Sequence, residues 1–420
     1  MVPYLKKRAI AYLRSLEQIT GTDMVYLGRS GFWGNFGLVI VSFLALGLYV
    51  VYANFLTPYE FGIYQYFLSL SIVISAFTLT GMNSAVTRSV ARGYDGALHQ
   101  ALRAQAQWAI LPVSVGIVIA SYYLYNGNTT FAVAGLVMGL VLPISNALTS
   151  YSAFLLGKQD FRRSFFYNLL INLPYYGSMA LAAVVFHSAI VVLVVNCFVN
   201  TIALFGAYVA TRKVYAPKDE PDPELPSYAR HLSTMNMPGM LLSQIDVFLT
   251  FYLLGPVSLA IYSFATALPD QLARFLKFIP GAALPKFSRA SHVDLQRTLG
   301  RKLVIIGVLS LIGAALYALV ASYIYQLLFP QYHEAAIYSQ VYAITMIGLV
   351  TTIVTTALVA HKRTRDLYIY NLLLPLFQTS ALTYGIFFYG LWGLVIAKVT
   401  ITVFALCCAL FLFFRPIDRE

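Results

Sequence analysis

Twelve apolar segments follow one another along this sequence, and each is close to the twenty or so residues that a helix needs to cross a bilayer. Such segments must form helices, because a helix satisfies its backbone hydrogen bonds internally where water is absent. The sequence therefore predicts an all-α polytopic membrane protein with twelve transmembrane helices. We place these spans at residues 33–56, 62–86, 104–125, 131–155, 165–186, 189–210, 234–254, 257–284, 303–328, 336–360, 367–388 and 391–414.

The composition leaves little room for a domain outside the membrane. Hydrophobic residues make up 59% of the chain and charged residues only 10%, whereas a soluble protein has about 25% charged residues. The net charge of +12 would be compatible with a nucleic-acid partner, but the basic residues stand in short loops between spans. Basic residues in that position act as topology signals and contact anionic phospholipids. We therefore expect anionic lipids, and no nucleic acid, as partners.

The Lys and Arg residues test the number of spans. If both termini are cytoplasmic, every Lys and Arg lies in a cytoplasmic segment except Arg274, Lys277 and Lys398, and the opposite loops contain none. An error of one span would destroy this segregation. We expect a multi-pass protein of the cytoplasmic (inner) membrane with both termini inside.

Two polar segments divide the chain. Residues 1–30 contain an amphipathic stretch, which predicts a helix lying in the headgroup layer, with a disordered basic tail as the alternative. Residues 212–230 contain four prolines and mixed charge, which predicts a solvated cytoplasmic linker. The remaining chain forms an N-lobe of six spans at 31–211 and a C-lobe of six spans at 231–420.

The two lobes carry a trace of duplication. Residues 55–64, FLTPYEFGIY, align with residues 253–262, LLGPVSLAIY, and both stretches join one span to the next on the outer side. Because six spans is an even number, both lobes have the same orientation in the membrane. The sequence predicts a pseudo-two-fold axis along the membrane normal and a central cavity between the lobes.

The eighth span carries charges that a lipid-facing helix would not retain. Asp270, Arg274 and Lys277 fall within an arc of about 80° on a helix, and a charge at the bilayer centre costs about 2.5–3.5 kcal/mol. Two cations on one face suit a pyrophosphate, since arginine offers a bidentate fork and lysine a point charge. Two alternatives stay open: Lys277 extends to the inner headgroups, or Arg274 pairs with Asp270 or Asp246.

Two further charges lie deep within spans. Asp246 is near the middle of the seventh span, where it would neutralise Arg274, bind a coupling cation, or belong to a permanent structural pair. Lys398 is about eight residues into the twelfth span, too deep to reach the outer headgroups easily, and is a candidate cavity cation. Na⁺ and H⁺ are the candidate coupling ions.

The first six spans contain asparagines at helical spacing in place of charges. Asn168 and Asn172 form one pair and Asn196 and Asn200 another, while Asn35 and Asn83 stand nearer the span ends. Each pair presents its amides on one helix face. They would bind sugar hydroxyls in a wet cavity or, as the alternative, hydrogen-bond to neighbouring helices.

These motifs resemble a known family. The outer turns with their Ile-Tyr pairs, Asp246 ahead of LLGPVSLAIYSFA, and the basic PKFSR after the eighth span are similar to the polysaccharide-synthesis branch of the multidrug/oligosaccharidyl-lipid/polysaccharide (MOP) exporter superfamily. The resemblance covers the whole chain. It implies a Wzx-like O-antigen flippase, which moves polyprenyl-pyrophosphate-linked oligosaccharide for polysaccharide biosynthesis by alternating access, alongside other polysaccharide assembly proteins.

The sequence bears on two other function classes. An ion-coupled multidrug exporter of the same superfamily is the alternative, but the first six spans contain no Asp or Glu and a cationic cavity would repel cationic drugs. A membrane enzyme is not favoured, because the chain shows no paired acids, nucleotide-binding glycines or metal-ligand clusters. We therefore expect no catalytic residues, no metal and no cofactor.

Overall fold

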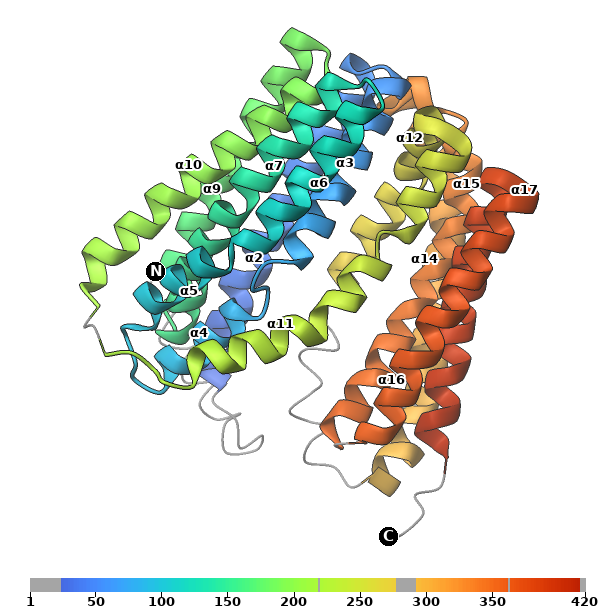
Figure 1. Cartoon of the computed structure of the whole chain (residues 1–420). Helices are drawn as coiled ribbons and strands as arrows, with labels where there is room; N and C mark the ends of the chain where they lie inside the picture. The colour runs from blue at the N-terminus through green and yellow to red at the C-terminus, as the bar shows by residue number, and fades with distance from the viewer. Residues whose placement is uncertain (1–23, 218–219, 277–291, 362, 416–420) are drawn as a thin grey trace, which may run out of the picture. The chain divides into compact units, whose positions relative to one another are not determined.

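The computed structural model describes residues 24–217, 220–276, 292–361 and 363–415, and throughout these ranges the regular elements are helices, with no strand (Figure 1). The interfacial helix predicted at residues 3–19, within the segment 1–30, lies outside the described residues. The first helices are α2 (Met24–Phe55), α3 (Pro58–Ala76), α4 (Met82–Ala91), α5 (Ala97–Trp108), α6 (Ile110–Tyr125), α7 (Thr129–Leu148), α8 (Ser150–Gly157), α9 (Phe161–Phe186) and α10 (Ala189–Tyr215). They are followed by α11 (Leu225–Leu242), α12 (Ile245–Leu276), α14 (His292–Leu328), the short 3₁₀ helix η1 (Pro330–Tyr332), α15 (Ala335–Tyr342), the 3₁₀ helix η2 (Ala343–Ile347), α16 (Gly348–Ala360) and α17 (Thr364–Phe414).

Nine helical stretches of the described residues are long and apolar enough to cross a membrane. Two of these stretches each contain a sharp break, at Gly255 in α12 and at Gly390 in α17. When they are divided there, and α3 is added as a further apolar helix, the described residues contain at least part of each of the twelve predicted spans. The prediction of an all-α polytopic membrane protein is confirmed.

The chain reverses direction at both breaks. Gly255 has φ 85° and ψ 173°, and Gly390 has φ 58° and ψ −135°, conformations that residues with a Cβ rarely adopt. Across Gly255, the hydroxyl of Tyr262 donates to a carboxylate oxygen of Asp246 at 2.7 Å, and the two arms of α12 lie alongside each other in Figure 1. A single glycine therefore makes each turn between two antiparallel spans.

The contacts divide the described chain into two compact units. The first unit consists of the described residues up to Leu48, together with Ile74–Leu181 and Val194–Met237. The second consists of Tyr49–Val73, Ala182–Leu193 and the described residues from Pro238 onward. Every boundary between the units falls inside a helix, namely α2, α3, α9, α10 or α11. The lobes predicted at 31–211 and 231–420 are drawn from a repeat in the sequence. That these lobes form separate domains stays a prediction.

The core of the first unit is formed by four of its helices. Its core includes Met82, Val86, Leu98, Phe154 and Leu204, contributed by α4, α5, α8 and α10. Apolar residues at this spacing place one face of each helix inward, while the opposite face stays available to lipid.

The linker between the predicted lobes is partly docked on this unit. Asp222 is only 4% exposed; its carboxylate accepts a hydrogen bond from Ser89 Oγ at 2.5 Å, and its backbone N–H and C=O bond to the side-chain amide of Gln100. Arg88 and Arg92 both pair with Glu224, at 3.3 and 3.1 Å. The expectation of a solvated linker is therefore wrong for this part of it, because a buried carboxylate with these partners is fixed in place.

The second unit brings together the two outer turns that the repeat predicts. A Cβ on Gly62 would overlap the carbonyl oxygen of Pro256, so the start of α3 and the turn of α12 touch through their backbones. Aromatic rings pack near this contact. The ring centroids of Phe61 and Phe264 are 4.6 Å apart, and Phe264 stacks on Tyr332 with a centroid distance of 3.9 Å. A separate core joins α14, α16 and α17 through Leu299, Val350, Val354, Leu412 and Phe413.

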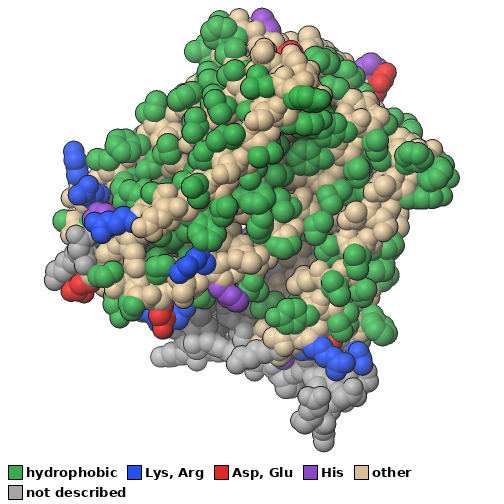
Figure 2. Space-filling view, in the orientation of Figure 1, with side chains coloured by type: hydrophobic (Ala, Val, Ile, Leu, Met, Phe, Trp, Pro, Cys, Tyr) green, Lys and Arg blue, Asp and Glu red, His purple; other side chains and the backbone are tan. Residues whose placement is uncertain are grey.

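Large apolar side chains remain exposed on both units. Leu319 is 80% exposed, Phe387 72% and Leu170 66%. Hydrophobic side chains cover much of the face seen in Figure 2, and the Lys and Arg side chains in that view lie at the left edge and in the lower half. In water such surfaces would drive aggregation, whereas lipid tails solvate them. The exposed faces are those of a multi-pass membrane protein.

The turn at Gly255 yields a test of the fold. We expect Gly255→Ala to lower the thermal unfolding midpoint of the detergent-solubilised protein, at a cost of about 1–3 kcal/mol, because alanine is strained at this φ and ψ. No side chain crowds the position, so the penalty comes from the backbone alone. Gly313→Ala, in the interior of α14 and equally uncrowded, is the control and should raise the midpoint or leave it unchanged. Equal midpoints for the two variants would contradict the strained turn.

Candidate functional site

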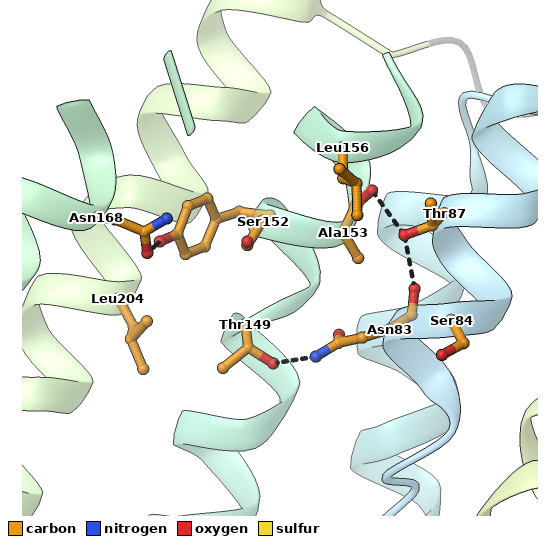
Figure 3. A pocket seen from close by; sticks show the side chains of 10 residues that line it. Asn83, Ser84, Thr87, Thr149, Ser152, Ala153, Leu156, Asn168 and Leu204 are labelled. Carbon is orange, nitrogen blue, oxygen red and sulfur yellow. Dashed lines mark hydrogen bonds between the residues drawn. The ribbon is translucent and has the colours of Figure 1, made fainter. Parts of the chain in front are cut away.

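A polar pocket opens in the first unit between α4, α8, α9 and α10. It has a volume of about 350 Å³. Figure 3 shows Asn83, Ser84 and Thr87 on α4 facing Thr149 and Ser152, with Asn168 of α9 at the far side. The remaining lining residues are Tyr151, Ala153, Leu156 and Leu204. Among the described residues no Asp, Glu, Lys or Arg lines the pocket, so the polarity of this lining comes from amides and hydroxyls.

Hydrogen bonds hold part of this lining in place. Asn83 Nδ2 donates to Thr149 Oγ1 at 2.9 Å, and Thr87 Oγ1 donates to the carbonyl oxygens of Asn83 and Ala153. Tyr151 donates to Asn168 Oδ1 at 3.4 Å. These bonds fix α4, α8 and α9 against one another. Among the described residues they leave Ser84 Oγ, Ser152 Oγ and Asn168 Nδ2 available to a ligand.

A second pocket shares a wall with the first. Its volume is about 460 Å³, and it lies between α2 and α9. Asn168 and Leu156 line both pockets. Asn172 also lines the second, and its side chain donates to the carbonyl oxygen of Asn168 at 2.7 Å. Most of the other lining is apolar, including Leu38, Val41, Phe161 and Phe165.

The other predicted pair of asparagines lies elsewhere on α10. Asn196 Nδ2 donates to Tyr175 Oη on α9 at 3.1 Å, which is the interhelical hydrogen bond that the sequence left open as the alternative. Asn200 is half-buried on the same helix. Neither residue lines the two pockets just described, or a third pocket between α16 and α17.

The start of α9, which positions Asn168, is tied to the end of α10. Tyr215 Oη donates to Asp160 Oδ2 at 2.6 Å, and the N–H of Arg163 donates to Oδ1 at 3.1 Å. Burial raises the pKa of Asp160, but these two hydrogen bonds and the nearby guanidinium of Arg163 outweigh it and hold the pKa below its usual value. The carboxylate is therefore ionised at neutral pH and keeps the beginning of α9 in register.

The predicted charges of the seventh and twelfth spans meet in the second unit. Lys398 Nζ lies 2.6 Å from Asp246 Oδ2, and Tyr262 donates to the same oxygen at 2.7 Å. Asp246 is only 6% exposed, and its other oxygen, Oδ1, has no hydrogen-bond partner among the described residues. Asp246 therefore pairs with Lys398 rather than with Arg274. In this arrangement the ammonium of Lys398 is neutralised.

The described charges of the eighth span have different surroundings. Asp270 accepts a hydrogen bond from Tyr342 Oη of α15 at 3.2 Å. Arg274, one turn later at the end of α12, is exposed. Lys277 lies outside the described residues. Of the predicted cations, Arg274 is thus the one whose described surroundings leave it open to an anion.

Sequence reasoning missed most of the polar pocket. Ser84 and Thr87 stand three residues apart, as do Thr149 and Ser152, and such spacing puts two hydroxyls on one helix face. That signal was present, but hydroxyls in membrane helices commonly bond to their own backbone. The sequence alone does not show which of them face a cavity.

The comparisons with known proteins agree with this fold. The family model described as polysaccharide biosynthesis protein matches residues 27–291. The structure of the lipid II flippase MurJ in an inward closed conformation is similar at 11% identity and a TM-score of 0.69, over 90% of this chain and 86% of that one. An inward-facing multidrug resistance MATE family transporter of the MOP superfamily is similar at 16% identity and a TM-score of 0.60, over 89% and 94%. No curated protein matches by sequence.

A third solved structure shares the fold. A MOP superfamily transporter from Pyrococcus furiosus, whose title reports a binding pocket of reversed polarity, is similar at 16% identity and a TM-score of 0.53, over 97% of this chain and 96% of that one. At these identities the likeness of all three structures establishes the fold, and it leaves the cargo open.

The pair of Asp246 and Lys398 can be tested by stability. We expect Lys398→Met to destabilise the purified protein by about 3–5 kcal/mol, because it leaves a buried carboxylate without its counter-ion. Adding Asp246→Asn should restore most of the loss, since the double variant buries no unpaired charge. Thermal unfolding in detergent measures both. A double variant no more stable than Lys398→Met would contradict the pairing.

Proposed function

Because this chain belongs to the polysaccharide biosynthesis protein family, we propose that it is a flippase for polyprenyl-pyrophosphate-linked oligosaccharide. On this proposal it moves an O-antigen or another surface polysaccharide repeat unit across the cytoplasmic membrane by alternating access. Both termini stand on the cytoplasmic side, and the protein works with other polysaccharide assembly proteins.

One observation carries this proposal beyond the family. The polar groups that line the pocket of the first unit are amides and hydroxyls, beside a few apolar side chains, and no charged side chain of the described residues lines it. Amides donate and accept hydrogen bonds at once, as sugar hydroxyls do, so such a lining suits a neutral glycan. A cationic drug would call for a carboxylate there, and the pocket offers none.

The pyrophosphate needs a separate cationic site. Arg274 is exposed at the end of α12 and provides a planar fork for phosphate oxygens. Lys277, three residues later in sequence, is the second cation of this proposed site. Lys398 is held by Asp246, so in the proposal it contributes to the anion site only in a state in which that pair opens. Na⁺ or H⁺ binding at Asp246 is the proposed means of opening it.

The function is tested first by surface-glycan complementation. We expect Arg274→Ala to reduce surface glycan by about tenfold or more in a strain that lacks its own flippase, and Arg274→Ala with Lys277→Ala to abolish it, because each lost charge-assisted hydrogen bond is worth about 1.5–3 kcal/mol. Lys302→Ala, an exposed cation on α14, is the control and should retain full activity. The amount of each variant in the membrane is measured alongside.

Two results would count against the proposal. Full glycan display by the double variant would reject the anion site. Resistance to cationic drugs conferred by the wild type, without any glycan display, would instead support a multidrug exporter.

A further inference from the structure

The second unit contains a pocket that none of the predicted site residues line. It lies between α16 and α17 and has a volume of about 480 Å³. Thr351, Thr352 and Thr355 of α16 line it together with Tyr370 and Asn371 of α17. Like the polar pocket of the first unit, it is lined by hydroxyls, an amide and apolar side chains, and no Asp, Glu, Lys or Arg of the described ranges lines it.

This pocket repeats the first one in sequence. Residues 167–170 read YNLL, and residues 370–373, which follow 203 positions later, also read YNLL. Asn168 lines the first pocket and Asn371, its counterpart at this separation, lines the second. The helices agree as well, since α9 begins at Phe161 and α17 begins 203 residues later at Thr364.

The same separation relates other lining residues of the two pockets. Thr149, Ser152 and Leu156 of the first pocket correspond to Thr352, Thr355 and Val359 of the second, each 203 residues later. Hydroxyl matches hydroxyl at two positions, and an aliphatic residue matches an aliphatic residue at the third. Four lining positions, counting the asparagines, thus keep their chemical type across the repeat.

The second pocket also holds a polar group that lacks a partner. Thr351 is 7% exposed, and its hydroxyl has no hydrogen-bond partner among the described residues. Thr352 and Thr355 donate to backbone carbonyl oxygens one turn earlier, which leaves their oxygens as acceptors. A ligand with several hydroxyls would satisfy all three, whereas a lipid tail would satisfy none.

We propose that the pocket of Thr351, Thr355 and Asn371 is a second saccharide-binding subsite, the counterpart in the second unit of the pocket around Asn168. This inference rests on the proposed function, because it takes the carried glycan as the ligand of both pockets. It adds that each half of the protein has its own site for sugar residues of the carrier-linked oligosaccharide.

The test uses the purified full chain in lipid nanodiscs. The probe is a lipid extract from a strain that makes the polyprenyl-linked oligosaccharide, compared with an extract from a strain that makes the polyprenyl carrier without the glycan. The measurement is the shift of the thermal unfolding midpoint as extract is added, taken relative to each variant without extract. Differences in stability between variants therefore do not enter the comparison.

We expect Asn371→Leu and Thr355→Val to raise the half-saturating concentration of the glycan-bearing extract, by roughly tenfold for the asparagine, because the amide's hydrogen bonds are lost. Asn168→Leu should act similarly in the first pocket. Asn54→Leu is the matched control, since Asn54 is exposed on α2 and bonds only to Val50 of its own helix. It should bind as the wild type does.

The outcomes separate the two proposals. If the wild type responds equally to both extracts, the flippase proposal fails and the subsite fails with it. If the wild type responds to the glycan while both Asn371→Leu and Thr355→Val bind as the wild type does, the second subsite is overturned and the flippase proposal stands. A response of these variants that is weakened for both extracts alike would mark the pocket as a lipid site and also overturn the inference.

Discussion

The structure depends on one constraint, which is that a polar group inside a membrane must find a partner or face water. Asp246, Lys398 and Tyr262 meet this constraint as a compact cluster, and Asn196 meets it through Tyr175. The hydroxyls of Ser84, Ser152 and Thr351 make no such contact among the described residues and stand instead in pockets, where a ligand can reach them. In this chain, a polar side chain that already has a protein partner has a structural role, whereas a polar side chain that a ligand can reach belongs to a candidate binding site.

This distinction assigns different roles to residues that look alike in sequence. Asn168 and Asn196 are both asparagines at helical spacing in apolar spans, yet one lines two pockets and the other joins two helices. Likewise Arg274 is exposed, while Lys398 is held by a carboxylate. In the proposed function, the neutral lining around Asn168 would bind the glycan and the exposed guanidinium of Arg274 would bind the pyrophosphate.

The fold was predictable from the sequence to a large extent, and the site much less so. Span length and the segregation of Lys and Arg define the helices, because both reflect the dimensions and charge asymmetry of a membrane rather than any detail of packing. The partner of Asp246 was not predictable, since Arg274 is near in sequence and Lys398 is more than a hundred residues away. The burial of Asp222 was missed for a similar reason, because its partners Ser89 and Gln100 come from distant helices.

The boundaries of the two units have a mechanical consequence. The chain passes from one unit to the other inside α2, α3, α9, α10 and α11, and the segment between α10 and α11 is clamped by Asp222 and Glu224. A flexible loop would let the two units move independently, whereas a continuous helix bends only gently unless it contains a kink. Any rearrangement of the units must therefore bend several helices together. Pro238, at the last boundary, is a position where α11 can kink. Helices shared between the two units therefore favour a concerted motion over independent motion of each unit.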